Sequence, residues 1–228
     1  MRALDVMTTQ VITVKPDMSV RDAAALLVER HISGAPVVGD DGSLVGIISE
    51  GDLLRRVEIG TDQARRTRWL DIFTTNADAD AYVKSHANRV ADVMTHEVIS
   101  VGEEDSLSHI ATIMESKGVK RLPVLRDGRV VGIVSRANLL QALASSAPDP
   151  AAVSAGDREI REKLMTELEG RPWAFAGRNV VVHDGVVHLW GIFSSTEAVQ
   201  AVRVTAERIP GVKRVEDHTE PYPIMPGY

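Results

Sequence analysis

The sequence predicts an α/β protein of the α+β kind, with two βαββα units followed by a smaller αββαβ unit. Two recurrences support this prediction: "DVMT" at Asp5 returns at Asp92, and "GIISEGDLL" at Gly46 returns as "GIVSRANLL" at Gly132. Short β-branched stretches also alternate with amphipathic helical patterns in both copies. The last third of the chain lacks the repeat but has its own helix and strand patterns.

The composition is that of an ordinary globular protein. Of 228 residues, 44% are apolar and 25% are charged, and 26 basic against 32 acidic residues give a net charge of -6. Without a basic patch, nucleic-acid binding is not expected. The absence of cysteine excludes disulfides and thiolate sites. The N-terminus has no apolar core of a signal peptide and no stretch resembles a spanning helix, so we expect a cytoplasmic protein.

The first copy reads as strand, helix, hairpin and short helix. "QVITV" predicts the strand, and "SVRDAAALLVERH" predicts a helix whose buried stripe is Ala24, Leu27 and Val28. A hairpin turns at residues 41–42, and the short helix follows Ser49.

The second copy repeats this order. "EVISV" predicts its strand and "SLSHIATIMESKG" its helix, with Ile110, Ile113 and Met114 in the buried stripe. Its hairpin turns at residues 127–128, and the closing helix follows Ser135.

The C-terminal third begins with a small, Pro-containing linker. A helix capped by Asp157 follows, with an apolar stripe, and then a hairpin at residues 184–185. Ser194 and Glu197 have capping-box spacing for a second helix, and "VKRVEDHTE" predicts a last strand. The expected apolar stripe is Ile160, Leu164 and Leu168.

These repeated motifs resemble a tandem pair of CBS motifs, the module named after cystathionine β-synthase, over residues 5–143. The resemblance implies two units around a pseudo-twofold axis, with clefts that often hold adenosine-type ligands. "VVVHDGVVHLWG" and "IPGVKRVED" resemble a BON domain over residues 154–220, which implies attachment or self-association. That segment has nine basic and eleven acidic residues, so we expect weak or absent membrane binding and a protein partner.

The expected domain boundaries follow from these patterns. The segments are CBS motif 1 at 1–58, a helical connector at 59–91, CBS motif 2 at 92–144, a linker at 145–156, the BON-like domain at 157–220 and a tail at 221–228. In the connector we expect two short helices, at 69–73 and 79–86, and Trp69 and Phe73 either cap the core or form a dimer contact.

Ser49 and Asp52 allow two interpretations. Their spacing is that of a helix capping box. The resemblance implies a second role, in which Asp52 accepts hydrogen bonds from the ribose hydroxyls and free amides at the helix start suit a phosphate. In the second copy Ser135 is followed by Asn138, which cannot make the same charge-assisted contacts, so we expect a weaker or empty second cleft.

Other candidate site residues follow from position and resemblance. Lys120 and Arg121 either neutralise a phosphate or form a solvated strand end. The resemblance implies an adenine pocket lined by the segment before the first helix and by the next strand, with equivalents in the second copy. These candidate lining residues are Val11, Ile12, Thr13, Ala35, Pro36, Leu122 and Pro123.

The sequence therefore favours a non-enzymatic sensor acting as a homodimer. Its expected ligand is AMP, ADP, ATP, NAD or S-adenosylmethionine, with no cofactor required, and its BON-like module engages an unknown protein partner. The alternative is a constitutive scaffold with empty clefts, assembled or attached to a membrane through that module. No catalytic constellation is visible, and His183 with His188 lacks a third ligand for zinc, so no metal site is expected.

Overall fold

The computed structural model describes residues 1–54, 60, 61, 83–145, 154–171, 173, 174, 179–193 and 195–221. The chain divides into two compact units: one comprises Ile12–Ile99 and Asp127–Val130, and the other comprises Met1–Val11, Ser100–Arg126 and Val131–Tyr228. The expected helix at 69–73, most of the linker and the tail from 222 lie outside the described residues. Of the expected helix at 79–86, only 83–86 is described, and it is helical.

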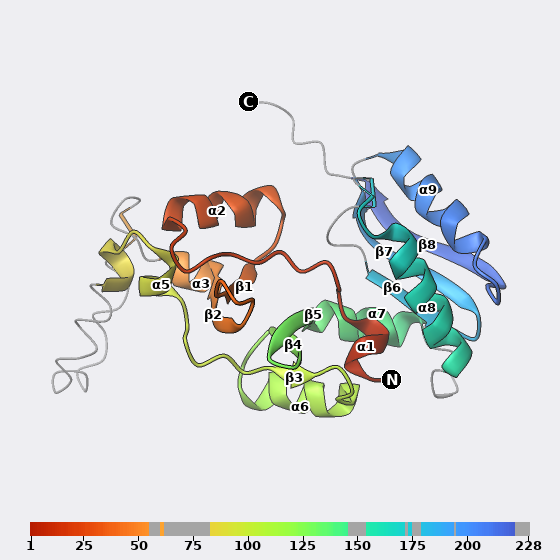
Figure 1. Ribbon diagram of the computed structural model, residues 1–228, viewed down its shortest axis with the longest axis horizontal. Helices are drawn as coiled ribbons and strands as arrows, with labels where there is room; N and C mark the ends of the chain where they lie inside the picture. The colour runs from red at the N-terminus through yellow and green to blue at the C-terminus, as the bar shows by residue number, and fades with distance from the viewer. Residues whose placement is uncertain are drawn as a thin grey trace. The chain divides into compact units, whose positions relative to one another are not determined.

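The unit that begins at Ile12 contains the first repeat. Helix α2 (Val20–Glu29) is followed by strands β1 (Gly34–Val38) and β2 (Leu44–Ser49) and by helix α3 (Glu50–Leu53) (Figure 1). β1 and β2 are antiparallel. The strand expected before α2 is reduced to a single parallel bridge between Val14 and Val37.

Helix α2 buries a different stripe from the one expected. Ala23 and Leu27 are buried, whereas Val28 is 74% exposed, so the predicted stripe was wrong at that position. A shift of one residue turns a helical side chain by about 100°, which suffices to move it from the core to the surface. The core of this unit also contains Val37 and Ile48.

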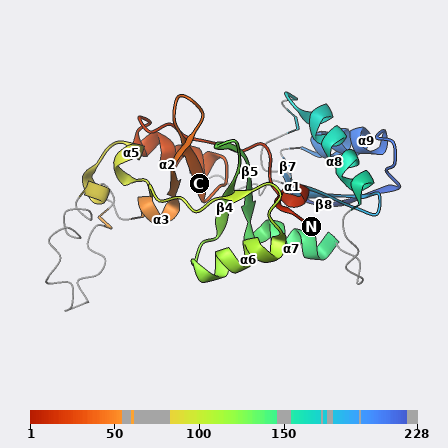
Figure 2. The same cartoon turned by 60° about the horizontal axis from the view of Figure 1, so that its bottom comes forward.

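The second repeat lies mostly in the other unit. β3 (Val101–Gly102), α6 (Leu107–Ser116), β4 (Arg121–Arg126), β5 (Arg129–Ser135) and α7 (Arg136–Ser145) follow the expected order. The sheet order is β3-β4-β5, and α6 and α7 lie side by side next to it (Figure 2). Ile110 and Met114 are buried as expected.

The two "DVMT" segments are exchanged between the repeats. Thr8, after α1 (Ala3–Val6), exchanges two backbone hydrogen bonds of 3.0 Å with Ile133 of the second repeat. Thr95, after α5 (Val90–Val93), exchanges two of 2.9 Å with Ile47 of the first repeat. Each repeat is therefore completed by the segment that precedes the other one.

The C-terminal module has the expected order: α8 (Ala155–Leu168), β6 (Asn179–His183), β7 (Val186–Phe193), α9 (Thr196–Glu207) and β8 (Arg214–Pro221). β7 is central, antiparallel to β6 and parallel to β8. Both helices pack on one face of this sheet (Figure 1). The expected stripe is buried at all three positions, Ile160, Leu164 and Leu168.

The caps of both helices differ from the expectation. Ser154 is the N-cap of α8, and Asp157 is the acid of its capping box. Ser195, rather than Ser194, caps α9 by accepting a hydrogen bond from the Ala198 amide. Several Ser and Asp residues near each start satisfy the same rule, so the pattern left the cap position ambiguous. In the part of the chain that is described, no helix has the length and apolar character needed to cross a membrane.

Candidate functional site

The first candidate site is built from three extended segments of one unit. The Val14 amide donates to the Pro36 carbonyl at 3.0 Å, which aligns residues 12–14 with β1. On the other side of β1, Ala35 pairs with Ile48 of β2, and Ser49 ends that strand. The structure thus brings Ile12, Thr13, Ala35, Pro36 and Ser49 close together, while Val11 belongs to the other unit.

Asp52 is a capping residue with one oxygen largely uncommitted. Its Oδ2 accepts hydrogen bonds from the Ser49 amide at 2.9 Å and from the Ser49 hydroxyl at 2.7 Å. Its Oδ1 is 3.5 Å from the Thr95 hydroxyl, a distance at which little hydrogen-bond strength remains. Asp52 is also partly exposed, so Oδ1 can accept further bonds while Oδ2 holds the helix start.

Asn138 makes the same cap but is otherwise fully engaged. Its Oδ1 accepts from the Ser135 amide at 2.8 Å and from the Ser135 hydroxyl at 2.7 Å. Its Nδ2 donates to the Val6 carbonyl at 3.1 Å, and the residue is only 4% exposed. The amide therefore fastens the N-terminal segment to α7, a role that only its NH₂ group can perform.

The remaining candidates of the second repeat lie around the start of β4. The Arg136 amide donates to the Lys120 carbonyl at 3.1 Å, so the start of β4 lies beside the end of β5. Lys120 is exposed and Arg121 is partly buried, whereas Leu122 and Pro123 are buried. In the first repeat the equivalent bond joins the Glu50 amide to the Ser33 carbonyl at 3.1 Å, so the first amide of α3 already has a partner.

A glycine in each repeat allows the exchanged methionine to approach. A Cβ atom on Gly46 would lie 2.4 Å from the Met94 Sδ, and one on Gly132 would lie 2.4 Å from the Met7 Sδ. Both methionines are buried. In each repeat, the glycine of the "VGI" motif therefore packs against the methionine of a "DVMT" motif.

Two arginines of α8 hold the N-terminal segment against the C-terminal module. Arg158 Nε donates to the Asp5 Oδ1 at 2.8 Å, and the Asp5 side chain is 2% exposed. The hydrogen bond that Arg158 donates to the Asp5 carboxylate raises the pKa of Arg158. Arg161 donates to the Met7 carbonyl at 2.6 Å and to the Val180 carbonyl at 2.9 Å.

Arg161 remains a cation although it is buried. Burial lowers the pKa of Arg161 to about 10, against a smaller opposing effect of Asp5, which leaves the guanidinium protonated at neutral pH. Sequence reasoning missed both arginines. The only signal was their i, i+3 spacing on α8, which is equally common on solvated helix faces.

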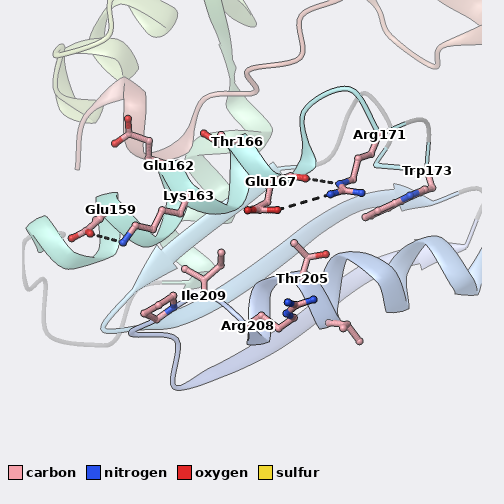
Figure 3. Close-up of a pocket in the computed structure, with 12 residues that line it drawn as sticks. Glu159, Glu162, Lys163, Thr166, Glu167, Arg171, Trp173, Thr205, Arg208 and Ile209 are labelled. Atoms are coloured by element: carbon pink, nitrogen blue, oxygen red, sulfur yellow. Dashed lines mark hydrogen bonds and ion pairs between the residues drawn. The ribbon is translucent and has the colours of Figure 1, made fainter.

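A groove lies between α8 and α9 on the C-terminal module (Figure 3). Its volume is about 810 Å³, and Trp173 is among the residues that line it. Lys163 pairs with Glu159 at 2.6 Å, and the Arg171 Nη2 lies 3.9 Å from the Glu167 Oε2. Glu162 and Arg208 also line the groove, so acidic and basic side chains balance there and the groove does not favour a strongly anionic or cationic ligand.

Family models match two segments of the chain to the CBS domain, residues 3–59 and 90–145, and a third segment, residues 156–220, to the BON domain. The chain belongs to the CBS-domain family, with its CBS segments in a tandem pair and a C-terminal BON domain. This confirms both resemblances found in the sequence.

Individual relatives share the CBS part. The CBS domain-containing protein CBSX1 (chloroplastic) of Arabidopsis thaliana is 36% identical over 135 residues, 57% of each chain, so the match spans little more than half of that relative. The uncharacterized protein MJ1426 of Methanocaldococcus jannaschii is 34% identical over 143 residues, 58% of this chain and 85% of that one.

A solved structure of CBSX2 from Arabidopsis thaliana in complex with AMP is also similar. It is 33% identical, with a TM-score of 0.55, and the match covers 63% of this chain and 96% of that one. The CBS pair of this protein thus has the fold of a relative that binds AMP.

Proposed function

We propose that this protein is a non-enzymatic regulator that binds an adenosine-containing ligand beside Asp52 and transmits the binding to its BON domain. The observation that carries the proposal is the Asp52 carboxylate, whose Oδ1 stays available at a partly exposed helix start. A carboxylate oxygen that is available in this way can accept hydrogen bonds from both hydroxyls of a ribose. The AMP complex of CBSX2 makes AMP the first ligand to test.

The second cleft is proposed to be weaker or empty. Asn138 is buried and its Nδ2 is bonded to the Val6 carbonyl, so it offers no free carboxylate to a ribose. Lys120 and Arg121 lie at the start of β4 and can contribute positive charge to a phosphate. Because the second cleft lacks a free carboxylate, we expect one strong site per chain.

Transmission is proposed to run along the N-terminal segment. The chain passes from one unit to the other between Val11 and Ile12, and Ile12 and Thr13 lie beside the proposed pocket. Five residues before Ile12, the Met7 carbonyl accepts a hydrogen bond from Arg161 of α8. A ligand that shifts residues 12 and 13 would therefore act on a segment that the BON domain holds.

The binding test is calorimetry of the full chain with AMP, followed by ADP, ATP, NAD and S-adenosylmethionine. We expect one strong site, and Asp52→Ala should lose about 1.5–3 kcal/mol of binding, or roughly 10- to 150-fold. Asp52→Asn keeps an acceptor for the cap, and Glu115→Gln on α6 is the control for a lost charge. Unchanged affinity in a folded Asp52→Ala variant would show that Asp52 only caps the helix and does not bind the ligand.

The transmission test is hydrogen exchange of α8 and β6 with and without the bound ligand. We expect AMP to change the exchange of these elements in the wild-type chain and to change it less in Arg161→Met. Arg203→Met, on the exposed side of α9, is the matched control. Equal responses in the wild type and Arg161→Met would exclude this route.

The proposed homodimer uses apolar positions that are equivalent in the two repeats. Leu54 is 62% exposed and Leu140, at the same place in the second repeat, is 66% exposed, while Leu143 is 72% exposed. Large exposed aliphatic side chains at repeated positions favour burial against a second copy.

Light scattering of Leu140→Glu against the wild type tests the dimer. The variant should be monomeric at concentrations where the wild type is dimeric. Val204→Glu, on α9 of the BON domain, is the control, because it should leave the dimer intact. Loss of assembly in Val204→Glu instead would favour the alternative, a scaffold assembled through the BON domain.

A further inference from the structure

The face of the BON sheet opposite its helices gathers imidazoles. Val187, Leu189 and Val215 belong to the core that includes α8 and α9. Because side chains alternate along a strand, His188 of β7 faces the other way. The parallel register pairs His188 with Glu216 and Trp190 with His218, so these side chains share that opposite face.

Three ligand atoms on this face lie within a few ångströms of one another. The His188 Nδ1 is 3.1 Å from the His218 Nε2 and 3.3 Å from the Glu216 Oε2, and the last two atoms are 3.7 Å apart. A triangle with these sides has a point about 2.1 Å from all three corners. That is the distance at which Zn²⁺ binds imidazole nitrogen and carboxylate oxygen.

We propose that His188, Glu216 and His218 form a Zn²⁺ site that joins β7 to β8. Two histidines and one glutamate are a donor set that Zn²⁺ uses in proteins, with a further position left for water or another ligand. The neutral nitrogen and hard oxygen donors exclude a preference for thiophilic ions such as Cu⁺.

The surroundings of the cluster orient its donors. Arg214 holds the other oxygen of Glu216, with Nη2 2.6 Å from Oε1, which leaves Oε2 for the histidines. The ring of Trp190 stacks on His218 with centroids 4.1 Å apart. Residues that fix ligand side chains in this way are typical of metal sites.

A third imidazole lies on the same face. His188 pairs with Val181 of β6, so His183, two residues further along β6, lies diagonally across from His188. His183 is 5% exposed. Both of its ring nitrogens are buried without a hydrogen-bond partner among the residues described. Buried unpaired polar atoms are uncommon in folded proteins, which sets this face apart from an ordinary packing surface.

Access to the site remains open. His188 is nearly buried, but the side chains of His218 and Glu216 are 33% and 35% exposed. An ion can therefore enter from solvent while the strand register holds the donors in place.

The first experiment titrates the demetallated full chain with Zn²⁺ in competition with a chromophoric chelator. We expect one site per chain, weakened on the order of 100-fold in His218→Ala. His109→Ala, on the exposed side of α6, should bind as the wild type does. A wild-type chain that binds no Zn²⁺, or an affinity equal in His218→Ala and the wild type, would show a hydrogen-bonded imidazole pair only.

A second measurement guards against misfolding of the variant. Co²⁺ bound to the wild-type chain should give the intense visible absorption of a four- or five-coordinate ion, and Glu216→Gln should change that spectrum while keeping the far-UV circular dichroism. The weak absorption of hydrated Co²⁺ in the wild type would overturn the proposal.

Discussion

The two repeats begin their last helices with the same Ser-x-x-Asp/Asn box but use it differently. In the first repeat, Asp52 caps the helix and keeps Oδ1 available. In the second, Asn138 caps the helix, and its NH₂ group donates a hydrogen bond to the Val6 carbonyl. The change from acid to amide thus converts a helix start with an available acceptor, where we propose ligand binding, into one that binds the chain's own N-terminal segment.

The "DVMT" segments show the same division. Asp5 is buried and paired with Arg158 of the BON domain, whereas its equivalent, Asp92, is exposed. Among the described residues, α8 forms these side-chain bonds with the segment that completes the second repeat. One repeat has therefore become the docking partner of the BON domain, and the other retains an open helix start.

The largest effect is expected for Asn138→Asp. If an acid at this position held a ribose as proposed for Asp52, the change would strengthen the second cleft, but the buried bond to the Val6 carbonyl changes the expectation. A carboxylate would face the Val6 carbonyl with no donor between them and should destabilise the fold by about 3 kcal/mol, as for an uncompensated buried charge. Denaturant unfolding at pH 7 measures this loss.

Acid pH provides the internal control for Asn138→Asp. Below about pH 4 the new carboxyl is protonated and can donate to the Val6 carbonyl, so the loss should shrink. A variant as stable as the wild type at pH 7 would mean that the Val6 bond is dispensable.

The next largest effect is expected for Gly132→Ala, at about 2 kcal/mol. The new methyl group would lie too close to the Met7 side chain, including the Met7 Cβ at 3.2 Å. That Cβ cannot move unless the backbone moves with it. Gly46→Ala should cost less, because Met94 approaches with its terminal atoms. Gly51→Ala, with space around it, is the control in thermal unfolding, and equal losses at 46 and 132 would contradict the argument.

A smaller loss of folding stability, about 1.5 kcal/mol, is expected for Asp157→Asn. This substitution alters the capping box of α8, to which we assign a purely structural role. Burial opposes ionisation of Asp157, but hydrogen bonds from the Gly185 amide and from Ser154 together lower the pKa of Asp157 below its ordinary 3.8. Its stabilisation is therefore present above that value and lost as the pH falls through the lowered pKa.

Urea unfolding of Asp157→Asn and the wild type at pH 7 and pH 3 tests this expectation. The two chains should differ at pH 7 and approach each other at pH 3. A difference that is the same at both pH values would show that the carboxylate charge is irrelevant.

The smallest effect is expected for Asp52→Asn, within about 0.5 kcal/mol of wild-type stability, because Asn and Asp cap helices equally well. Asn138 already accepts the same two bonds through its Oδ1. Thermal unfolding measures the difference, and a large loss would mean that the charge of Asp52 supports the fold as well as the proposed ligand.

Much of the fold followed from local patterns. Turn residues placed the hairpins, where Asp127 and Asp184 adopt the positive φ that such turns require. The apolar spacing of α8 selected its buried residues, because a helix with one apolar stripe has a single face to bury. The stripe of α2 was misplaced, because Ala and Val side chains occur on both of its sides.

The sequence by itself determined the repeat, the order of elements, the capping box of Ser49 and Asp52 and the candidate position Asp52, since each depends on residues close together in the chain. Only the tertiary structure decided that each "DVMT" segment completes the other repeat, that Asn138 binds Val6, that Arg161 holds Met7, and that Glu216 and His218 join His188. These contacts unite residues up to 154 positions apart, and their partners are backbone carbonyls or side chains on other strands, which leave no periodic signal in a sequence.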